Sequence, residues 1–483
     1  MKRYIEGVFR DQGVLFPVHL EDWIDDENVV RVIEAFVDEL DLPGLGFELA
    51  EATGRPGYHP SVLLKLYIYG YLNRVQSSRR LERETLRNVE VMWLLGRLSP
   101  DHKTIADFRK DNGEAIRKVC AQFVELCRQI GLLATASVAI DGSKFKAVNN
   151  RDRNFTKAKM QRRKKQIEES ISRYLNQLDS ADRQDPSEAI TSRVTRLKEK
   201  IGKLKEEMAR LKVLETQMLA TSDEQVSLTD PDARSPIELD GATSGRGSGV
   251  VGYNVQAAVE TEHHLIIAHD VIQSGSDRAS LAPMANKAKE ALGVDELDVV
   301  ADRGYFSSEQ ILECNQADVT VTLPKPMTTG VNANGQFGKP DFRYVSDDDV
   351  YICPAGQTLS FVSHKRQADG PNLRRYATEA CGYCALKERC TSSTQRVITR
   401  WEHEHLVDDV QRRLDENPQA MRQRRETVEH PFGTIKMRLG ATHFLMKRLK
   451  NVRTETALSV LAYNLTRVIN ILGITPLIQA IRA

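Results

Sequence analysis

The stretch SVAIDG at residues 137–142 opens the part of the chain that carries the clearest fold signal. Its apolar and β-branched residues predict a strand, and its final Asp-Gly pair predicts a turn. Beyond it, strands first follow one another and then alternate with helices, which predicts a mixed sheet with helices on its faces, an α/β fold. The expected order is strand, strand, strand, helix, strand, helix, strand, over residues 137–142, 251–260, 264–273, 279–293, 297–305, 307–317 and 318–326.

The first 130 residues have apolar positions at helical spacing, with Pro60 suited to a first helical turn. This region predicts a domain of short helices, and two interpretations of its basic residues stay open. One is a helix that docks on DNA, and the other is a helical bundle with a solvated basic face. The pattern alone favours the bundle, because surface helices are routinely charged. The basic residues in question are Arg79, Arg80, Arg83 and Arg87.

A long heptad-like segment follows the first predicted strand. Its two apolar series are separated by the polar stretch DSADRQDPSE, which predicts two helices in an antiparallel coiled-coil hairpin. Each helix is short, so we expect the hairpin to pair with itself or with a second subunit. The apolar positions are Ile167, Ile171, Tyr174 and Leu178 in the first helix, and Leu197, Ile201, Leu204, Met208 and Leu211 in the second.

Composition sets outer limits on the kind of protein. The chain has 483 residues, with 68 Lys and Arg against 67 Asp and Glu, so a uniformly basic coat is excluded but local basic patches are not. Seven cysteines and no apolar signal segment predict a reducing compartment such as the cytoplasm. The apolar C-terminal segment contains Asn464, Arg467 and Pro476, which favours a buried helix over a membrane span.

We therefore expect four parts along the chain. They are a helical N-terminal domain that is a candidate for DNA binding (1–130), a mixed-sheet core in three pieces (131–155, 222–326 and 421–475), a coiled-coil insertion (156–221) and a loop-rich, Cys-containing insertion (327–420).

Two aspartates stand at the ends of predicted strands: Asp141 in SVAIDG and Asp302 in LDVVADRGY. Taken singly, each is typical of a turn. Together they indicate a site, because the first and fourth strands should be neighbours and both carboxylates should emerge where those strands end. Carboxylates held close repel each other unless a cation lies between them. We therefore expect a divalent cation and a third carboxylate.

The third carboxylate is predicted in the motif RRETVEHPFGTIK. Arg425 lies four residues before Glu429, and Lys436 lies seven after it, so all three share a helix face if the proline only kinks the helix. A solvated face with an Arg–Glu pair explains the same spacing. Glu426 is the competing carboxylate. Three such oxygen ligands suit Mg²⁺ or Mn²⁺, and two of these ions about 4 Å apart support phosphodiester chemistry.

With these motifs in place, the sequence resembles the DDE-class insertion-sequence transposases of bacteria, whose catalytic core has an RNase H-like fold. The resemblance covers most of residues 137–470, and HPSVLLKLYIYGYL and KTIADFRK resemble the helical domain that precedes the core in these proteins. The matching blocks, in order, are AIDGSKFKA, VGYNVQAAVETEHHLIIAHDV, VVADRGYFSSEQI, YICPAGQTL, RWEHE and RRETVEHPFGTIKMRLGATHFL.

The resemblance implies a catalytic triad of Asp141, Asp302 and Glu429 that binds a divalent metal. It also implies binding to the terminal inverted repeats of a mobile element, with metal-dependent cleavage and transfer of double-stranded DNA by a dimer or higher assembly. In the Tyr–Arg–Glu–Lys signature of many such enzymes, the tyrosine position is held here by Arg422, which departs from the pattern. The residues expected to contact DNA are Arg422, Arg425, Lys436 and Lys144.

Four cysteines in Gly-rich loops form a second candidate site. Cys353, Cys381, Cys384 and Cys390 contain one Cys-x2-Cys pair, and four thiolates in loops suit a structural Zn²⁺. Reduced cysteines without metal are the alternative. The remaining cysteines, Cys120, Cys127 and Cys314, lie in apolar helical patterns and are expected in the core.

Three other functions stay open at this stage. An RNase H-like nuclease that cuts without joining would use the same carboxylates. A catalytically inactive DNA-binding relic is the second alternative, although the filled triad positions argue against it. A coiled-coil structural protein is the third, and the long mixed-sheet region disfavours it.

Overall fold

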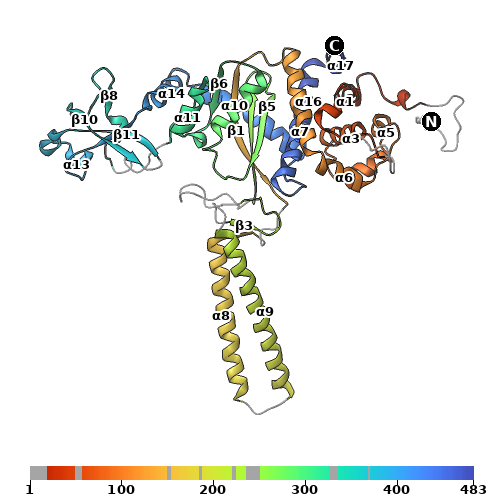
Figure 1. Ribbon diagram of the computed structural model, residues 1–483, viewed down its shortest axis with the longest axis horizontal. Helices are drawn as coiled ribbons and strands as arrows, with labels where there is room; N and C mark the ends of the chain where they lie inside the picture. Colours follow the sequence, from red (N-terminus) through yellow and green to blue (C-terminus); the bar gives the residue numbers. More distant parts are fainter. Residues whose placement is uncertain are drawn as a thin grey trace, which may run out of the picture.

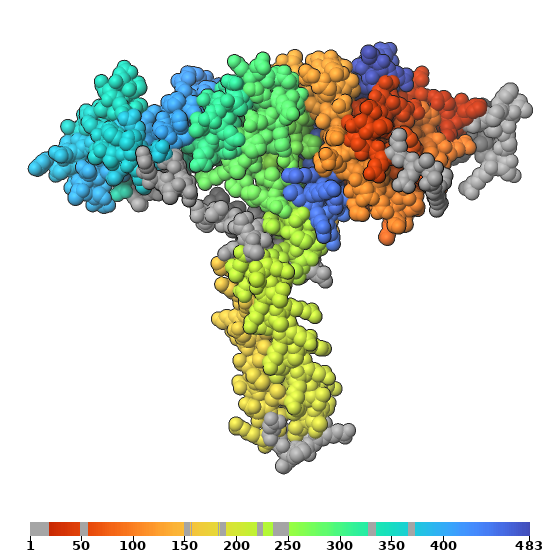
Figure 2. Space-filling view, viewed as in Figure 1, coloured from red at the N-terminus to blue at the C-terminus, as the bar shows by residue number. Residues whose placement is uncertain are grey.

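The computed structural model describes residues 19–48, 57–148, 154–183, 188–219, 225–234, 251–326, 335–367 and 370–483. A helical N-terminal part, a central sheet with its helices and a second, smaller sheet lie in a row (Figure 1). A two-helix hairpin projects from the middle of this row. Figure 2 shows that the hairpin stands clear of the rest of the molecule over most of its length.

The N-terminal part is built from short helices that pack around the almost fully buried α3. Local sequence sets several of their starts. Asn28 caps α1, Asp101 caps α6, and Pro60 begins α3 as its sequence predicted. The elements are η1 (Leu20–Trp23), α1 (Val29–Asp38), α2 (Leu42–Leu45), α3 (Pro60–Leu72), α4 (Ser78–Thr85), α5 (Val89–Leu94), α6 (His102–Asp111) and α7 (Gly113–Gln129).

The central sheet is mixed, as the sequence predicted, with strand order β5-β4-β1-β6-β7. Strand β1 pairs antiparallel with β4, β4 pairs antiparallel with β5, and β1, β6 and β7 run parallel. The helices that join the parallel strands pack on the sheet. The elements are β1 (Ser137–Lys146), β4 (Gly252–Glu260), β5 (Ile266–Ile272), α10 (Leu281–Leu292), β6 (Leu297–Ala301), η3 (Arg303–Tyr305), α11 (Ser308–Gln316) and β7 (Val319–Thr322).

Strand β1 is longer than its sequence predicted. The Asp-Gly pair does not turn the chain, and β1 continues to Lys146 because β4 pairs with it up to Gly252. Gly142 instead allows other side chains to pack closely against β1. A Cβ atom built on it would lie 2.3 Å from Nε2 of Gln256 and 2.8 Å from Oδ1 of Asp277. The glycine therefore makes room for polar side chains beside Asp141.

Two C-terminal helices complete the main core: α16 (Leu449–Leu472) and α17 (Ile474–Arg482). Helix α16 packs on α3 and α7 as well as on β5, and it is buried as predicted. Its Asn464 exchanges hydrogen bonds of 3.0 and 2.9 Å with the backbone N–H and C=O of Ile266 on the edge strand β5. In the described ranges, no single helix is long and apolar enough to cross a membrane.

The projecting hairpin consists of α8 (Lys157–Asp182) and α9 (Glu188–Leu219), and the short strands β2 (Asn154–Thr156) and β3 (Gln225–Ser227) pair at its base. Apolar side chains fill the interface between the helices, and ion pairs such as Arg163–Glu207 bridge it. Ile167, Leu197, Ile201 and Leu211 of the predicted heptad positions are buried.

The Cys-containing region is more regular than its sequence predicted. Within 335–401 the structure has an antiparallel sheet of order β12-β11-β10-β9-β8 in place of extended loops. Three of the five strands have only three or four residues and stand between turn residues, so they show no alternating pattern in the sequence. The elements are η4 (Lys339–Asp341), β8 (Arg343–Val345), β9 (Val350–Ile352), β10 (Thr358–Gln367), β11 (Gly370–Ala377), η5 (Glu379–Tyr383), α13 (Lys387–Cys390) and β12 (Ile398–Trp401).

Helices α14 (Glu404–Glu416) and α15 (Ala420–Gly433) lead from the second sheet back to the first, and α15 packs on β1, β4 and β6. Pro431 lies inside α15, and the chain continues into a π-helical turn, η6 (Thr434–Arg438), closed by the bond from Leu439 N–H to the carbonyl of Thr434. A π-helical turn is underwound, so residues on either side of it are rotated relative to an ideal α-helix.

Candidate catalytic site

The strand register brings Asp141 and Asp302 next to each other. Ile140 of β1 is the parallel partner of Ala301 of β6, and each of these two residues is followed by an aspartate. The prediction that these strands are neighbours is therefore confirmed. Asp141 lies within β1 and its side chain is 22% exposed, whereas Asp302 caps η3 and is 45% exposed. The pair is thus anchored in the sheet on one side and open to solvent on the other.

A basic residue that the sequence did not single out joins the two aspartates. The Nη2 atom of Arg424, on α15, lies 2.6 Å from Oδ1 of Asp141 and 3.8 Å from Oδ2 of Asp302. Its side chain is only 14% exposed, and its Nε is buried without a hydrogen-bond partner. The guanidinium therefore supplies the positive charge that two neighbouring carboxylates require.

A third aspartate, also missed from the sequence, lies against this pair. Oδ1 of Asp277 accepts hydrogen bonds of 2.7 Å from both Asn254 and Gln256 on β4. A Cβ atom built on Gly304 would lie 3.0 Å from Oδ1 of Asp302 and 3.7 Å from Oδ2 of Asp277. The available sequence signal was the pair of polar residues, two apart, in the otherwise apolar strand GYNVQAAVE.

A buried tyrosine holds this polar network in place. The hydroxyl of Tyr305 donates to Oε1 of Gln256, and this fixes which end of the Gln256 amide faces Asp277. Burial first, and then the nearby aspartates, raise the pKa of Tyr305 well above its ordinary value, so the hydroxyl stays protonated and remains a donor. The chain from Tyr305 through Gln256 to Asp277 is therefore a directed set of hydrogen bonds.

Opposing effects act on the charge of Asp141. Burial raises the pKa of Asp141 to about 6, and the negative charges of Asp302 and Asp277 act in the same direction. Arg424 and the N–H of Gly142, 2.8 Å from Oδ1 of Asp141, lower it. Since a further positive charge would favour the ionised form, the site is set up electrostatically to attract a cation.

The position of Arg424 leads to a prediction about stability. Arg424→Gln should lower the free energy of unfolding in chelator at pH 7 by about 2 kcal/mol, because it leaves two partly buried carboxylates without a counter-charge. Added Mg²⁺ or Mn²⁺ should restore part of this loss. The difference should shrink as the pH falls through about 6, where Asp141 takes up a proton in the folded state and its charge no longer opposes folding. Denaturant titrations with chelator and with metal measure it.

Arg425→Gln is the matched control, because Arg425 is the next residue and is exposed. It should change the free energy of unfolding by no more than about 0.5 kcal/mol under any of these conditions. An Arg424→Gln variant as stable as wild type in chelator, or one destabilised equally with and without metal, would contradict the counter-charge role.

Glu429 is on α15 but not in contact with this network. Its side chain is exposed, as is Arg425, whereas the adjacent Val428 is buried. Within the described ranges, the carboxylate oxygens of Asp141, Asp302 and Glu429 do not all lie within 4.8 Å of one another. The structure therefore brings together two of the three predicted catalytic residues, and the role of Glu429 stays a prediction.

Lys436 contacts β1 close to Asp141, and Lys144 lies on the same strand three residues beyond Asp141. The Nζ atom of Lys436 lies 2.6 Å from Oγ of Ser143 and 3.1 Å from the carbonyl oxygen of Lys144, and it stacks over the ring of Phe145. Burial lowers the pKa of Lys436, and the charge of Asp141 acts against this. The side chain of Lys144 is exposed. Lys436 thus fastens η6 to the strand two residues beyond Asp141.

The other two basic residues predicted to contact DNA are on the outer surface of α15. Arg422 forms an exposed ion pair with Glu426, with 2.9 Å between Nε and Oε1. Arg425 is exposed, as noted above. Neither approaches Asp141, and their assignment to DNA stays a prediction.

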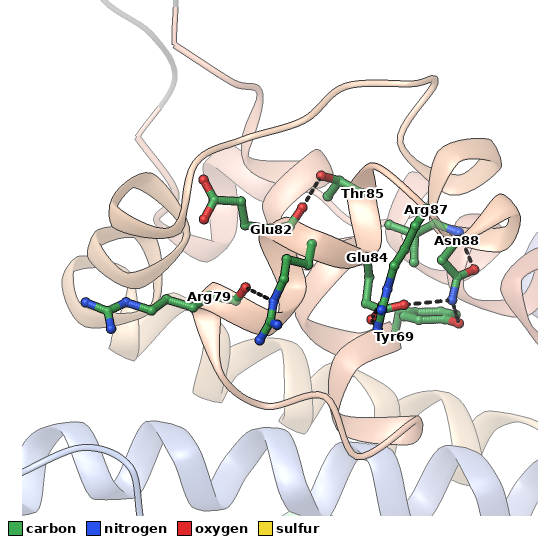
Figure 3. Close-up of polar contacts among 9 residues, drawn as sticks. Tyr69, Arg79, Glu82, Glu84, Thr85, Arg87 and Asn88 are labelled. Atoms are coloured by element: carbon green, nitrogen blue, oxygen red, sulfur yellow. Dashed lines mark hydrogen bonds and ion pairs between the residues drawn. The ribbon is translucent and has the colours of Figure 1, made fainter.

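Two of the four arginines singled out in the N-terminal part are labelled in Figure 3: Arg79 is on helix α4, and Arg87 is in the turn after it. Arg87 pairs with Glu84, and the hydroxyl of Thr85 donates to the carbonyl of Glu82 over 2.7 Å. Arg79 extends away from the helix and is exposed, as are the other three arginines of the sequence-derived set. This face of α4 is exposed to solvent, and both interpretations of its arginines, DNA docking and a solvated basic face, stay open.

One cluster elsewhere has the composition of a metal site. Ligand atoms of Glu260, Glu262 and His263, at the turn between β4 and β5, lie within 4.8 Å of one another. However, the buried Glu260 carboxylate already accepts hydrogen bonds from the backbone N–H groups of Glu262 and His263, the latter over 2.6 Å. The cluster is explained by the turn that it caps, and we assign no site to it.

Comparison with known proteins identifies the class. Residues 18–111 match the family model described as Transposase domain (DUF772), and residues 352–469 match the one described as Transposase DDE domain. These matches confirm the resemblance to DDE-class insertion-sequence transposases that was drawn from the sequence, because two separate parts of the chain match transposase domains. The second match includes Arg424, Glu429 and all four loop cysteines, whereas Asp141 and Asp302 lie outside both.

A comparison with curated proteins finds no match. Among solved structures, a cryo-EM structure of a piggyBac transposase synaptic complex with hairpin DNA is similar at a TM-score of 0.32 and 8% identity. That match covers 94% of this chain and 79% of the other.

Proposed function

We propose that this protein binds the terminal inverted repeats of an insertion sequence and catalyses metal-dependent DNA strand cleavage and strand transfer. The observation that carries the proposal is the register of β1 and β6, which sets Asp141 beside Asp302 with Arg424 between them. The transposase domains on either side of this pair in the sequence support the same function.

The donors at this site fit a hard divalent cation. Asp141 and Asp302 offer carboxylate oxygens from adjacent strands, and the two already share one positively charged group, the Arg424 guanidinium. Mg²⁺ and Mn²⁺ prefer such oxygens and retain waters that a substrate can replace. When bound, the metal would activate a water or a 3′-hydroxyl and stabilise the leaving oxygen. Arg424 would then give up its contact with one or both aspartates.

The residues around the pair have supporting roles in this proposal. Gln256 and Asn254 hold Asp277 beside the aspartates, where it adds negative charge to the site without being free to rotate. Tyr305 keeps the Gln256 amide oriented. Asp302, which is half-exposed, is the carboxylate that an approaching phosphodiester would meet first.

Glu429 is proposed as the third catalytic carboxylate, on the following grounds. Arg424 reaches Asp141 from five residues before Glu429, and Lys436 reaches Ser143 from seven residues after it. The segment that carries Glu429 is therefore held over β1 at both ends. Asp277 is the competing third ligand, because it already lies against Asp302.

We also propose that the central sheet is an RNase H-like core. Three antiparallel strands lie in the spatial order β5-β4-β1 and are extended by the parallel strands β6 and β7, which agrees with this proposal. On this proposal the α8–α9 hairpin and the second sheet are insertions between core elements, and the helical part up to residue 130 is a separate domain. Pairing of two copies on DNA is proposed with the function.

DNA is proposed to lie along the open edge at Asp302, bordered by basic residues. Lys436 lies against β1 close to Asp141, Lys144 is exposed on β1 three residues beyond Asp141, and Arg422 and Arg425 are exposed on α15. Lysines and arginines near the triad would hold the phosphate backbone against the negative charge of the carboxylates. The exposed arginines of α4 would serve the same purpose in the N-terminal part.

Lys436→Ala is a test of this DNA path. An ammonium has three donors, and two of those of Lys436 are used by Ser143 and Lys144, which leaves one for a phosphate. The substitution should make the plot of log affinity against log salt shallower by about one unit and should slow cleavage. Lys450→Ala, an exposed lysine on α16, should leave the cleavage rate unchanged. Slopes and rates identical to wild type for Lys436→Ala would remove this lysine from the site.

The experiment that tests the function as a whole uses a DNA fragment carrying the element's terminal inverted repeats, with and without Mg²⁺. We expect cleavage at the element ends followed by joining to a second duplex, both dependent on the metal. Cleavage without joining would favour a nuclease, and binding without cleavage would favour an inactive relic.

A further inference from the structure

We propose that Cys353, Cys381, Cys384 and Cys390 form a structural zinc site that closes one end of the second sheet. The inference does not depend on the transposase function. It rests on the convergence of the four residues, on the turns that hold two of their sulfurs and on the small core of the sheet that they join.

The four cysteines come from separate segments and meet at one cavity. Cys353 follows β9, Cys381 lies in η5, Cys384 ends that helical turn, and Cys390 is the last residue of α13. All four line the same cavity, whose other walls include Phe337, Phe342 and Leu359. None of the four is in a disulfide, and none is fully exposed. Their convergence is therefore tertiary and was not required by the Cys-x2-Cys spacing alone.

Backbone N–H groups point at two of the sulfurs. The N–H of Gln357 lies 3.3 Å from Sγ of Cys353, and the N–H of Leu386 lies 3.4 Å from Sγ of Cys384. The first of these turns needs Gly356, which has a φ of +75° and donates its own N–H to the carbonyl of Cys353 over 2.8 Å. Hydrogen bonds to sulfur favour the thiolate over the thiol, and the thiolate is the form that binds metal.

The four thiols also act on one another electrostatically. Burial raises the pKa of Cys390, Arg396 lowers it, and Cys381, Cys353 and Cys384 raise it. Four thiolates at one cavity would repel one another strongly, and a divalent cation removes that repulsion. Zn²⁺ suits four sulfur ligands in a closed tetrahedral arrangement.

The second sheet has a small apolar core, so a bound metal would add to its stability. Its own buried apolar cluster consists of Phe342, Tyr351, Leu359, Tyr376 and Ile398, and Cys353 and Cys390 pack against it. A core of this size contributes little stability, and small modules generally rely on a metal or disulfides. The metal would then join the loops between β9 and α13 to one another beside this small apolar cluster.

The sulfurs must approach one another when the ion binds. In the described part of the chain, no three of these sulfurs all lie within 4.8 Å of one another, whereas tetrahedral Zn–S bonds of about 2.3 Å set them about 3.8 Å apart. A change of one χ1 rotamer moves a cysteine sulfur by about 3 Å. Rotation of the cysteine side chains is the movement that the proposal requires, and the turns at Cys353 and Cys384 are already formed.

The test is the metal content of the full-length protein purified without chelator. We expect about one zinc per chain that survives dialysis, its loss in Cys353→Ser and Cys384→Ser, and its retention in Cys314→Ala, which alters a buried cysteine of the main core. Asp141→Asn should also retain zinc, which separates this site from the aspartate pair. Wild-type protein without zinc, or zinc that persists in both serine variants, would overturn the proposal.

Cobalt substitution keeps the test decisive if a serine variant fails to fold. Wild-type protein exchanged with Co²⁺ should develop the sulfur-to-cobalt charge-transfer absorption of a four-thiolate site. It should also lose about four titratable thiols relative to the metal-free protein. Co²⁺ that binds without charge-transfer absorption would show ligands other than these cysteines and would overturn the assignment.

Discussion

Asp141→Asn and Asp302→Asn are each expected to reduce cleavage of terminal-repeat DNA by at least about a thousandfold, which corresponds to about 4 kcal/mol of transition-state stabilisation. The two side chains are adjacent because their strands are in parallel register, and both would bind the same cation. Asparagine keeps the shape of the side chain and its bond from the N–H of Gly142, but it removes the charge that holds the metal.

The measurement is single-turnover cleavage in Mg²⁺ and in Mn²⁺, with DNA affinity determined in parallel. Asp298→Asn is the control, because Asp298 is an exposed aspartate on β6, the strand that directly precedes Asp302. It should cleave at the wild-type rate, and all three variants should bind DNA with nearly wild-type affinity. A variant of Asp141 or Asp302 that cleaves normally would remove that residue from the reaction.

Glu429→Gln is expected to reduce cleavage by at least about a hundredfold, whereas Glu426→Gln should have little effect. Glu426 is engaged with Arg422 on the exposed surface, and Glu429 belongs to the segment held over β1 by Arg424 and Lys436. The loss in Glu429→Gln should appear in the cleavage rate and not in DNA affinity, because metal binding and phosphate contacts contribute separately.

Asp277→Asn distinguishes the two candidates for the third ligand. If Glu429 is that ligand, Asp277→Asn should slow cleavage by about tenfold through the loss of nearby charge, because the asparagine oxygen can still accept the bonds from Asn254 and Gln256. An Asp277 variant as inactive as Asp141→Asn, together with an active Glu429→Gln, would assign the third position to Asp277. An inactive Glu426→Gln with an active Glu429→Gln would show that the helix register is wrong.

The adjacency of Asp141 and Asp302 could be predicted from sequence because it depends only on strand order and on where the apolar runs end. Both properties can be read from the local pattern of apolar residues, because a strand that is buried on both faces of a sheet must be apolar along its length. The length of β1 could not be predicted in this way. Asp-Gly is typical of a turn, but here the glycine is required by the tight approach of Gln256 and Asp277, which is a tertiary fact.

The sequence also did not predict that Arg424, and not Arg425, contacts Asp141. Ideal helical spacing aligns Arg425, Glu429 and Lys436, yet Pro431 and the π-helical turn after it change the rotation along this segment. One residue of difference is about 100° around a helix, which separates a buried ion pair with Asp141 from an exposed position. Asp277 lies after an edge strand in a polar loop, where no periodic signal exists to mark it.

Direct measurement of metal binding by wild-type protein tests the central claim, that Asp141 and Asp302 together hold a divalent cation. Mn²⁺ can be titrated into zinc-loaded protein and followed by the loss of the free-ion spin-resonance signal, for wild type, Asp141→Asn, Asp302→Asn and the control Asp298→Asn. We predict a site in wild type and in Asp298→Asn that is weakened at least about tenfold in each of the other two variants. Unchanged Mn²⁺ affinity in both Asp141→Asn and Asp302→Asn would contradict the account.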